Sequence, residues 1–437
     1  MSFGLAVTIG NTIGAGILRT PGDVAAALPS TWLFLGVWVV GACYALLGTN
    51  ALAELGTMLP RSGAQYVYAR HAFGDYAGFV VGWNDWISTA ASSAAISIVI
   101  GESLAALFAP LDMHAVHIAM ATVAVFTILL WRGTRTGAHT QELTSLFKAL
   151  ALLAFVVACF AFGGRAAPVT GGDAGSTPIV HAPLIVSFIL AAQSVIYTYD
   201  GWNGPLYFAE ELRDPGRQIP RSMFGGLLSI AAIYLLMNAA YLHVLPVRAI
   251  AGSTLAAAAV AQAIFGAWGE VVVRVIVVIA LPSAVNACLL MSSRVMYGVS
   301  RDGLGPRLAT RVNAGGTPTS ALLLSALVAL GFLVTGTFET VIAVAAFFFV
   351  ANYTLSFLAV FVLRRREPLA PRPWRAVGHP WTTGLVLAGS LAFLVGAVLS
   401  DTRNSIYALG LVVVSVPVYL GMRRVRRVRG MVESSTD

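Results

Sequence analysis

Two long apolar segments of this chain are each interrupted near the middle by a run rich in glycine. The first run is GNTIGAGI at residues 10–17, and the second is YTYDGWNGP at residues 197–205. Glycine loses backbone entropy in a helix and Pro205 donates no backbone hydrogen bond, so neither run easily stays wound. Unwound backbone at membrane depth is stable only where protein buries it or where it lines a wet cavity. Two such breaks in corresponding halves predict a transporter with its substrate site between them.

A simpler interpretation of the glycines is that they let neighbouring helices pack closely. That interpretation explains either break alone better than it explains both together. We therefore expect the breaks to be functional.

The composition is that of a protein with many membrane spans. The chain is 58% hydrophobic and 11% charged, whereas a soluble domain carries about 25% charged residues. With about 20 residues for each span, the apolar runs predict an all-α membrane protein with twelve transmembrane helices. The predicted helices are 3–27, 31–55, 74–108, 114–131, 138–162, 183–210, 222–246, 268–300, 318–336, 338–363, 381–400 and 404–422.

Arginine sets the expected orientation. Most arginines follow the even-numbered predicted helices, while the opposite side holds only Arg165, Arg248 and Arg403. The positive-inside rule then places both termini in the cytoplasm. The net charge of +8 is spread over separate short loops, so nucleic acid is not an expected partner. The basic C-terminal tail is placed to contact anionic membrane lipid.

Cysteine and histidine predict no cofactor, no metal site and no enzyme. Cys43, Cys159 and Cys288 all lie inside apolar segments and are typical of small packing residues. The histidines are scattered along the chain, and no two of them stand four residues apart on one predicted helix. No nucleophile and base form a catalytic pattern either.

Lys148 is the only lysine in the chain, and it lies near the middle of the predicted helix 138–162. Its apolar stem could extend along the helix so that its ammonium reaches the membrane–water interface. Alternatively it is a fixed charge where a coupling cation would sit, or a titrating group. A buried ammonium needs oxygen partners. We expect a carbonyl near Gly10–Ile13, with Gly10 included, and the hydroxyl of Ser283.

Four other polar or aromatic residues near the breaks are candidates. Asp200, inside the second break, either meets an amine or caps freed N–H groups. Tyr197 and Trp202 flank that break and can cover a ligand. Arg19 follows the first break and either steers anionic substrates or forms a gate salt bridge. Asp85, in predicted helix 74–108, is expected to pair with a loop arginine.

Several motifs together resemble one family. Residues 14–17 (GAGI) look like a helix-one glycine motif, and residues 54–68 (ELGTMLPRSGAQYVY) resemble the loop after helix two. Residues 199–203 (YDGWN) with the loop that follows them are the most specific match. The chain resembles the amino acid–polyamine–organocation (APC) superfamily, and within it the L-type amino acid transporter branch. Further matching residues are 210–215, 219–221, 285–286 and 292–294.

The resemblance implies a leucine-transporter-like fold of two inverted repeats of five helices, with helices one and six broken. Two extra helices follow the repeats. The implied organisation is a first repeat at 1–163, an extracellular loop at 164–182, a second repeat at 183–363, a cytoplasmic loop at 364–380, and helices eleven and twelve with a basic tail at 381–437.

The resemblance also implies the chemistry of the ligand. The N–H groups of Ala15 and Gly16 open a half-helix whose positive end suits an α-carboxylate. Carbonyls near Thr12, Tyr197 and Asp200 suit an α-ammonium. Lys148 matches the family lysine that replaces a sodium ion, which implies sodium-independent transport. The implied substrate-binding residues are Thr12, Ile13, Gly14, Ala15, Gly16, Tyr197, Asp200, Trp202 and Asn203.

Three features depart from the family pattern. Ala15 stands where the glycine motif has serine, so only backbone can serve there, and Tyr197 stands where the family often has Phe or Trp. The chain also begins almost directly at the first helix. No cysteine is seen that would link it to a partner glycoprotein, so we expect a stand-alone protein in a bacterial plasma membrane.

The leading hypothesis is a sodium-independent carrier of L-amino acids, neutral ones above all, that works by alternating access. Exchange and proton symport both fit a central lysine and stay open. A second hypothesis is a cationic amino acid or polyamine carrier in which Asp200 holds the extra charge. A third is a channel or membrane sensor without turnover. The sequence does not select one amino acid.

Overall fold

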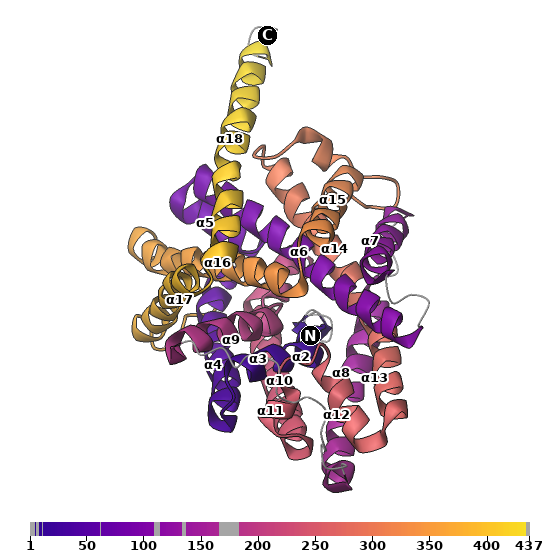
Figure 1. The fold of residues 1–437 in the computed structure, drawn as a ribbon. Coiled ribbons are helices and arrows are strands. Elements are labelled where there is room, and N and C mark those ends of the chain that lie inside the picture. The colour runs from indigo at the N-terminus through magenta and orange to yellow at the C-terminus, as the bar shows by residue number, and fades with distance from the viewer. Residues whose placement is uncertain are drawn as a thin grey trace.

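The fold is built from helices. The computed structural model describes residues 5, 8–10, 12–61, 63–108, 114–132, 137–165 and 183–433, and these residues form no strand beyond one isolated bridge between Val312 and Pro318. Most of the predicted loop at 164–182 lies outside this set. Figure 1 shows the helices gathered in one bundle from which the C-terminal helix projects.

The long helices follow the predicted spans closely. Among the described residues, nine helices are long and apolar enough to cross a membrane, which confirms a multi-pass membrane protein. The count of twelve and the inverted repeat stay predictions. The long helices are α4 (Thr31–Met58), α6 (Asp75–Leu107), α7 (Ala115–Arg132), α8 (Gly137–Phe162), α9 (Leu184–Tyr199), α10 (Pro215–Val244), α13 (Ala267–Ala280), α14 (Pro282–Arg301), α15 (Thr319–Thr335), α16 (Phe338–Arg366), α17 (Trp381–Ser400) and α18 (Thr402–Glu433).

Short helices fill the connections, and five of them were not among the predicted spans. They are α5 (Gln65–Phe73), α11 (Val247–Ile250), α12 (Ala256–Phe265), η2 (Gly163–Arg165) and η4 (Arg307–Thr310).

Both predicted breaks are present. Residues 8–10 and 12 are helical, the chain leaves the helix at 13–15, and helix resumes as α2 (Gly16–Arg19) and α3 (Pro21–Ala27). In the second half, α9 ends at Tyr199 and the chain continues as η3 (Gly204–Glu211). Gly201, between them, has φ of 107°, a left-handed conformation that favours glycine.

A third interruption was not predicted. The sequence favours one continuous helix over 268–300, but the structure divides it into α13 and α14 at Leu281 and Pro282. Pro282 has no N–H to donate to the preceding turn, so the hydrogen-bond ladder is broken there.

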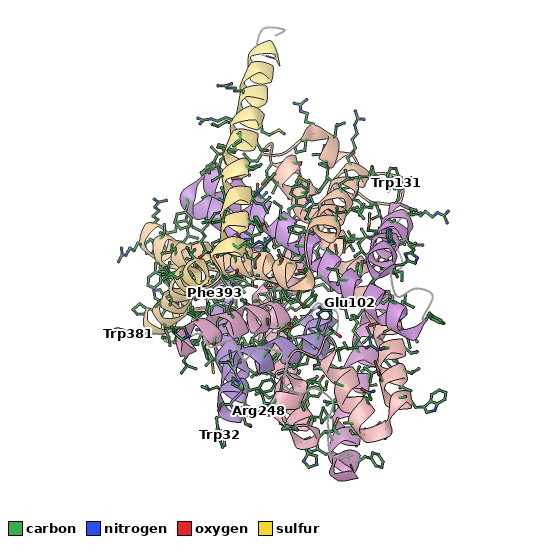
Figure 2. All side chains as sticks on the ribbon, viewed as in Figure 1. Trp32, Glu102, Trp131, Arg248, Trp381 and Phe393 are labelled. Atoms are coloured by element: carbon green, nitrogen blue, oxygen red, sulfur yellow. The ribbon has the colours of Figure 1, made fainter. Side chains whose placement is uncertain are left out.

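α6 is the central helix of the bundle. It packs against α5, α7, α14, α15 and α16, and its middle is a run of small residues at 88–97 that are almost all buried. Small side chains let helices approach closely in a membrane protein, where there is little hydrophobic drive for association. The periphery is different: Trp32, Trp131 and Trp381 point outward (Figure 2) and are 84%, 45% and 84% exposed.

Candidate substrate site

The two breaks meet at one small cavity. Its volume is about 60 Å³, and its walls come from both breaks and from α6, α14 and α16. Of the predicted site residues, seven are brought together here. The lining residues are Thr12, Gly14, Ala15, Gly16, Thr89, Ser92, Ile96, Tyr197, Thr198, Asp200, Gly201, Asn203, Tyr207, Cys288, Met291 and Phe349.

Ile13 and Trp202, also predicted for the site, do not line this cavity. Ile13 borders a neighbouring apolar cavity of about 40 Å³ instead. Trp202 is 2% exposed and stacks on Tyr353, with ring centroids 5.1 Å apart and planes at 27°. Its position behind the break fits a residue that braces the unwound segment.

The first break offers two backbone donors that have no backbone acceptor among the described residues. Within the described part of the chain, no backbone hydrogen bond is found for the N–H groups of Gly14 and Gly16. A Cβ atom at Gly14 would have nothing within 4 Å, so a ligand can approach the backbone there. At Gly16 a Cβ would lie 2.6 Å from Thr198 Oγ1, so that glycine allows α2 to pack on α9. Of the two interpretations of the glycines, an open functional break therefore applies to Gly14, and close helix packing applies to Gly16.

Two of the carbonyl oxygens that were predicted to bind the α-ammonium already accept one hydrogen bond each. Thr12 O accepts a hydrogen bond of 2.7 Å from the hydroxyl of Tyr234. Tyr197 O accepts one of 3.2 Å from the N–H of Asp200. Because a carbonyl oxygen has two lone pairs, each can accept a second donor.

Two carboxylates, the partly buried Asp200 and the buried Asp85, stand at the second break, and each is bonded to a tyrosine. Asp200 Oδ1 accepts from the hydroxyl of Tyr353. Asp85, 3% exposed, accepts from the hydroxyl of Tyr207 at 2.7 Å through Oδ1. Between the described residues, no ion pair joins either carboxylate to an arginine or lysine.

The predicted pairing of Asp85 with a loop arginine is therefore wrong. Asp85 lies ten residues into α6, where the helix has carried it away from the loops. The nearby loop arginine, Arg70, pairs instead with Asp75 at 2.8 Å and with Asp302 at 2.6 Å.

Lys148 is buried, with 4% of its surface exposed. Its ammonium lies 3.5 Å from Gly10 O, the carbonyl contact that the sequence predicts. The predicted contact with Ser283 is wrong. Ser283 donates to Ala280 O at 2.8 Å, because the break at Pro282 leaves helix carbonyls without their usual donor. Lys148 also lines the apolar cavity that Ile13 borders.

Arg19 forms the centre of an ion-pair cluster. This favours the prediction that Arg19 forms a gate salt bridge over the prediction that it steers anionic substrates. It is 4% exposed, and it pairs with Glu102 of α6 and with Glu339 of α16, the latter at 3.1 Å. Its guanidinium stands 4.1 Å from the centroid of Phe338, whose ring meets Tyr197 edge-on at 6.1 Å. The cluster therefore contacts the substrate cavity through two aromatic rings.

The resemblance implies that the substrate side chain points toward helices three, eight and ten, which are α6, α14 and α16, but the sequence did not identify which of their residues line the cavity. Thr89, Ser92 and Ile96 lie on one face of α6, at spacings of three and four residues, while Cys288 and Phe349 come from α14 and α16. The available signal was the serines and the threonine along 88–97, although the same small residues are also typical of close helix packing.

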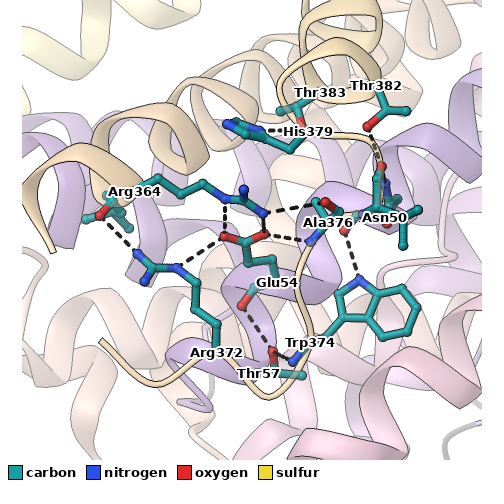
Figure 3. A network of polar contacts seen from close by, with 12 residues as sticks. Asn50, Glu54, Thr57, Arg364, Arg372, Trp374, Ala376, His379, Thr382 and Thr383 are labelled. Atoms are coloured by element: carbon teal, nitrogen blue, oxygen red, sulfur yellow. Dashed lines mark hydrogen bonds and ion pairs between the residues drawn. The ribbon is translucent and has the colours of Figure 1, made fainter. Parts of the chain in front are cut away.

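A second polar network lies away from the cavity, where α4 and α16 end (Figure 3). Glu54, 1% exposed, accepts from Arg364 Nε at 2.8 Å and from Nη2 at 2.6 Å. It also lies 3.2 Å from Arg372 Nε and accepts from the N–H of Ala376 at 2.7 Å. We call Glu54, Arg364, Arg372 and Ala376 the loop clamp, because they hold the segment between α16 and α17 against α4.

Comparisons with known proteins agree with this architecture. A family model described as amino acid permease matches residues 4–416. The serine/threonine exchanger SteT of Bacillus subtilis is 27% identical over 97% of this chain and 96% of its own length. The mouse b(0,+)-type amino acid transporter 1 is 26% identical over 85% of this chain and 76% of its length. The human large neutral amino acids transporter small subunit 2 is 26% identical over 84% of this chain and 70% of its own length.

Proposed function

Since the chain belongs to the amino acid permease family of the APC superfamily, we propose that it carries small neutral L-amino acids across the membrane by alternating access, without sodium. One observation carries the proposal: both breaks line the same cavity, the first with N–H groups that have no backbone acceptor among the described residues, and the second with the carboxylate of Asp200. A zwitterion has complementary charges at complementary ends.

The α-carboxylate is assigned to the first break. The N–H groups of Gly14 and Gly16 point from the start of a half-helix, whose dipole favours an anion. The α-ammonium is assigned to Asp200 and to the free lone pairs of Thr12 O and Tyr197 O. Tyr197 then covers the bound molecule and excludes water, which strengthens the polar contacts beneath it.

The preference for small neutral side chains has two supports. The cavity is small, about 60 Å³, and Thr89 and Ser92 supply hydroxyls along its wall. The relative from Bacillus subtilis is named for exchange of serine and threonine.

The position of Lys148 supports transport that does not need sodium. Its ammonium lies at a carbonyl of the first break, where it supplies a fixed positive charge. A buried cation at that point leaves no need for a metal ion there.

The orientation follows from the positive-inside rule. We propose a bacterial inner-membrane protein that acts without a glycoprotein, with both termini in the cytoplasm. In this orientation the ion pairs of Arg19 with Glu102 and Glu339 lie on the outer side of the cavity, where they would act as a gate.

A cationic amino acid or polyamine is the second candidate. It is favoured by Asp85 and Asp200, two carboxylates at the break that no arginine or lysine of the described chain neutralises. A substrate with an additional ammonium could supply the missing charge.

The test is uptake of a radiolabelled amino acid panel into proteoliposomes that contain the purified protein. Saturable uptake of L-serine or L-threonine, equal in sodium and in choline medium and stimulated by internal substrate, supports the proposal. Stronger competition by putrescine or arginine supports the second candidate. Binding without saturable uptake would point to a sensor or channel.

A further inference from the structure

Asp85 lies just behind the wall of the substrate cavity. Tyr207 lines the cavity and donates its hydroxyl to Asp85 Oδ1 at 2.7 Å. Thr89, one helical turn further along α6, also lines the cavity. The second carboxylate oxygen, Oδ2, is buried and has no hydrogen-bond partner in the described part of the chain.

An ionised carboxylate in such a place is unstable without a positive charge beside it. Taking an isolated charge out of water is costly, and the neutral hydroxyl groups of Tyr207 and Thr89 beside Asp85 offset only part of that cost. The titratable groups that face Asp85 are Tyr207 from η3 and Asp200 from the second break, and neither supplies a cation.

Two arginines on helices that pack against α6 are engaged elsewhere. Arg294 of α14 stands over the ring of Phe208, 4.8 Å from its centroid. Arg274 of α13 pairs with Glu270 at 2.8 Å. The described residues also contain no group of three or more His, Cys, Asp or Glu that could hold a metal ion.

We propose that Asp85 binds a proton on Oδ2 and that this proton is carried together with a neutral amino acid. The inference rests on the proposed function, because it takes the substrate to be a zwitterion. The substrate ammonium neutralises Asp200, and Asp85 then remains as the unpaired charge. A proton from the solution adds to a lone pair of Oδ2, gives a neutral carboxylic acid, and leaves again as a proton on the other side. No electrons are transferred.

Closure of the cavity explains why the two movements are coupled. When the cavity is open, water reaches the region of Tyr207 and stabilises a charged Asp85. When it closes, water leaves and the charged form becomes costly. Closure over a neutral amino acid therefore requires the proton, so one proton moves with each substrate molecule.

The experiment uses proteoliposomes loaded with a pH-sensitive dye, with L-serine added outside. The wild-type protein is expected to acidify the lumen as serine enters, and to take up more serine when the outside is acidic. Asp85→Asn fixes a neutral side chain of the same shape. It is expected to reduce the serine-induced acidification to that of protein-free vesicles and to remove the difference in uptake between pH 5.5 and pH 7.5. Asp401→Asn, a matched change at the end of α17, is expected to keep both.

Tyr207→Phe separates proton binding from simple packing. It keeps the ring but removes the hydrogen bond that stabilises the charged carboxylate. Asp85 then takes up its proton more readily, so the midpoint of the pH profile of uptake is expected to move to higher pH. A packing role would lower uptake equally at every pH.

The outcomes distinguish this inference from the proposed function. If wild-type vesicles take up no amino acid, the proposed function fails. If they take up serine without acidification, the function stands and the proton site is refuted. If acidification persists in Asp85→Asn and disappears in Lys148→Ala or Asp200→Asn, the proton binds at that other residue and the inference is overturned.

Discussion

Gly16 lies against Thr198, so closely that a Cβ atom added to it would be 2.6 Å from Thr198 Oγ1. At Gly14, two residues earlier, the same addition meets nothing within 4 Å. One glycine of the motif lets two half-helices touch, and the other leaves backbone open to the cavity. A substitution at Gly16 should therefore impair stability, and one at Gly14 should impair substrate binding.

Gly16→Ala is expected to destabilise the protein by about 1–3 kcal/mol, the usual cost of overpacking. Thermal unfolding in detergent, followed by size-exclusion chromatography, measures the loss. Adding Thr198→Ala removes the nearest hydroxyl and methyl group, so the double variant should recover part of the stability. An unchanged unfolding temperature in Gly16→Ala would contradict the close contact.

Gly14→Ala is expected to leave the unfolding temperature unchanged but to weaken substrate binding. Its methyl group would meet no atom within 4 Å, but it would occupy the place where the substrate carboxylate approaches the backbone. The apparent KM for L-serine should rise at least tenfold, with the protein present in the membrane at normal levels. Normal KM would mean that the carboxylate binds elsewhere.

Arg19→Met should loosen the closed side of the cavity, because it removes both ion pairs of the cluster while keeping the length of the side chain. The measurement is the labelling rate of Cys288, which lines the cavity. A membrane-impermeant thiol reagent is added from the side that bears Arg19, in a background with Cys43 and Cys159 replaced by serine.

Labelling is expected to be several times faster in Arg19→Met than in the parent. The control is Arg403→Met, an exposed arginine whose guanidinium lies 5.8 Å from the ring centroid of Tyr407 and outside the cluster. Equal rates in all three proteins would show that the ion pairs do not control access.

The loop clamp should contribute to stability through its geometry. Arg364 holds Glu54 with two parallel hydrogen bonds, an arrangement that lysine cannot reproduce. Removing one partner of a buried pair costs about 3–5 kcal/mol, and the value here should lie at the low end because Arg364 is 27% exposed.

We expect Glu54→Gln and Arg364→Lys both to lower the unfolding temperature clearly. Arg365→Lys, the same substitution at the exposed neighbouring residue, should have little effect. Wild-type stability in Arg364→Lys would mean that charge alone, without the paired geometry, is sufficient.

The sequence predicted the elements of the site better than the way in which they pack. The breaks were predictable because glycine and proline act locally, at Gly14, Gly201 and Pro205. The side walls were not, because the contribution of Ser92 or Cys288 depends on which faces of α6 and α14 turn toward the breaks. Lys148 shows both cases. Its need for an oxygen predicted the contact with Gly10, but the sequence did not show that Ser283 would bond to Ala280 O instead.

Lys148 gives the last prediction. Its ammonium lies 3.5 Å from Gly10 O and ties α8 to the broken helix that would bind the substrate carboxylate. Lys148→Ala should therefore reduce exchange of L-serine in proteoliposomes at least tenfold, while the amount of protein in the membrane falls much less. Lys148→Arg keeps the positive charge and should retain more activity than the alanine variant. Replacing sodium by choline should change nothing in the wild type. Exchange at the wild-type rate by Lys148→Ala would instead favour a lysine that only extends to the membrane interface.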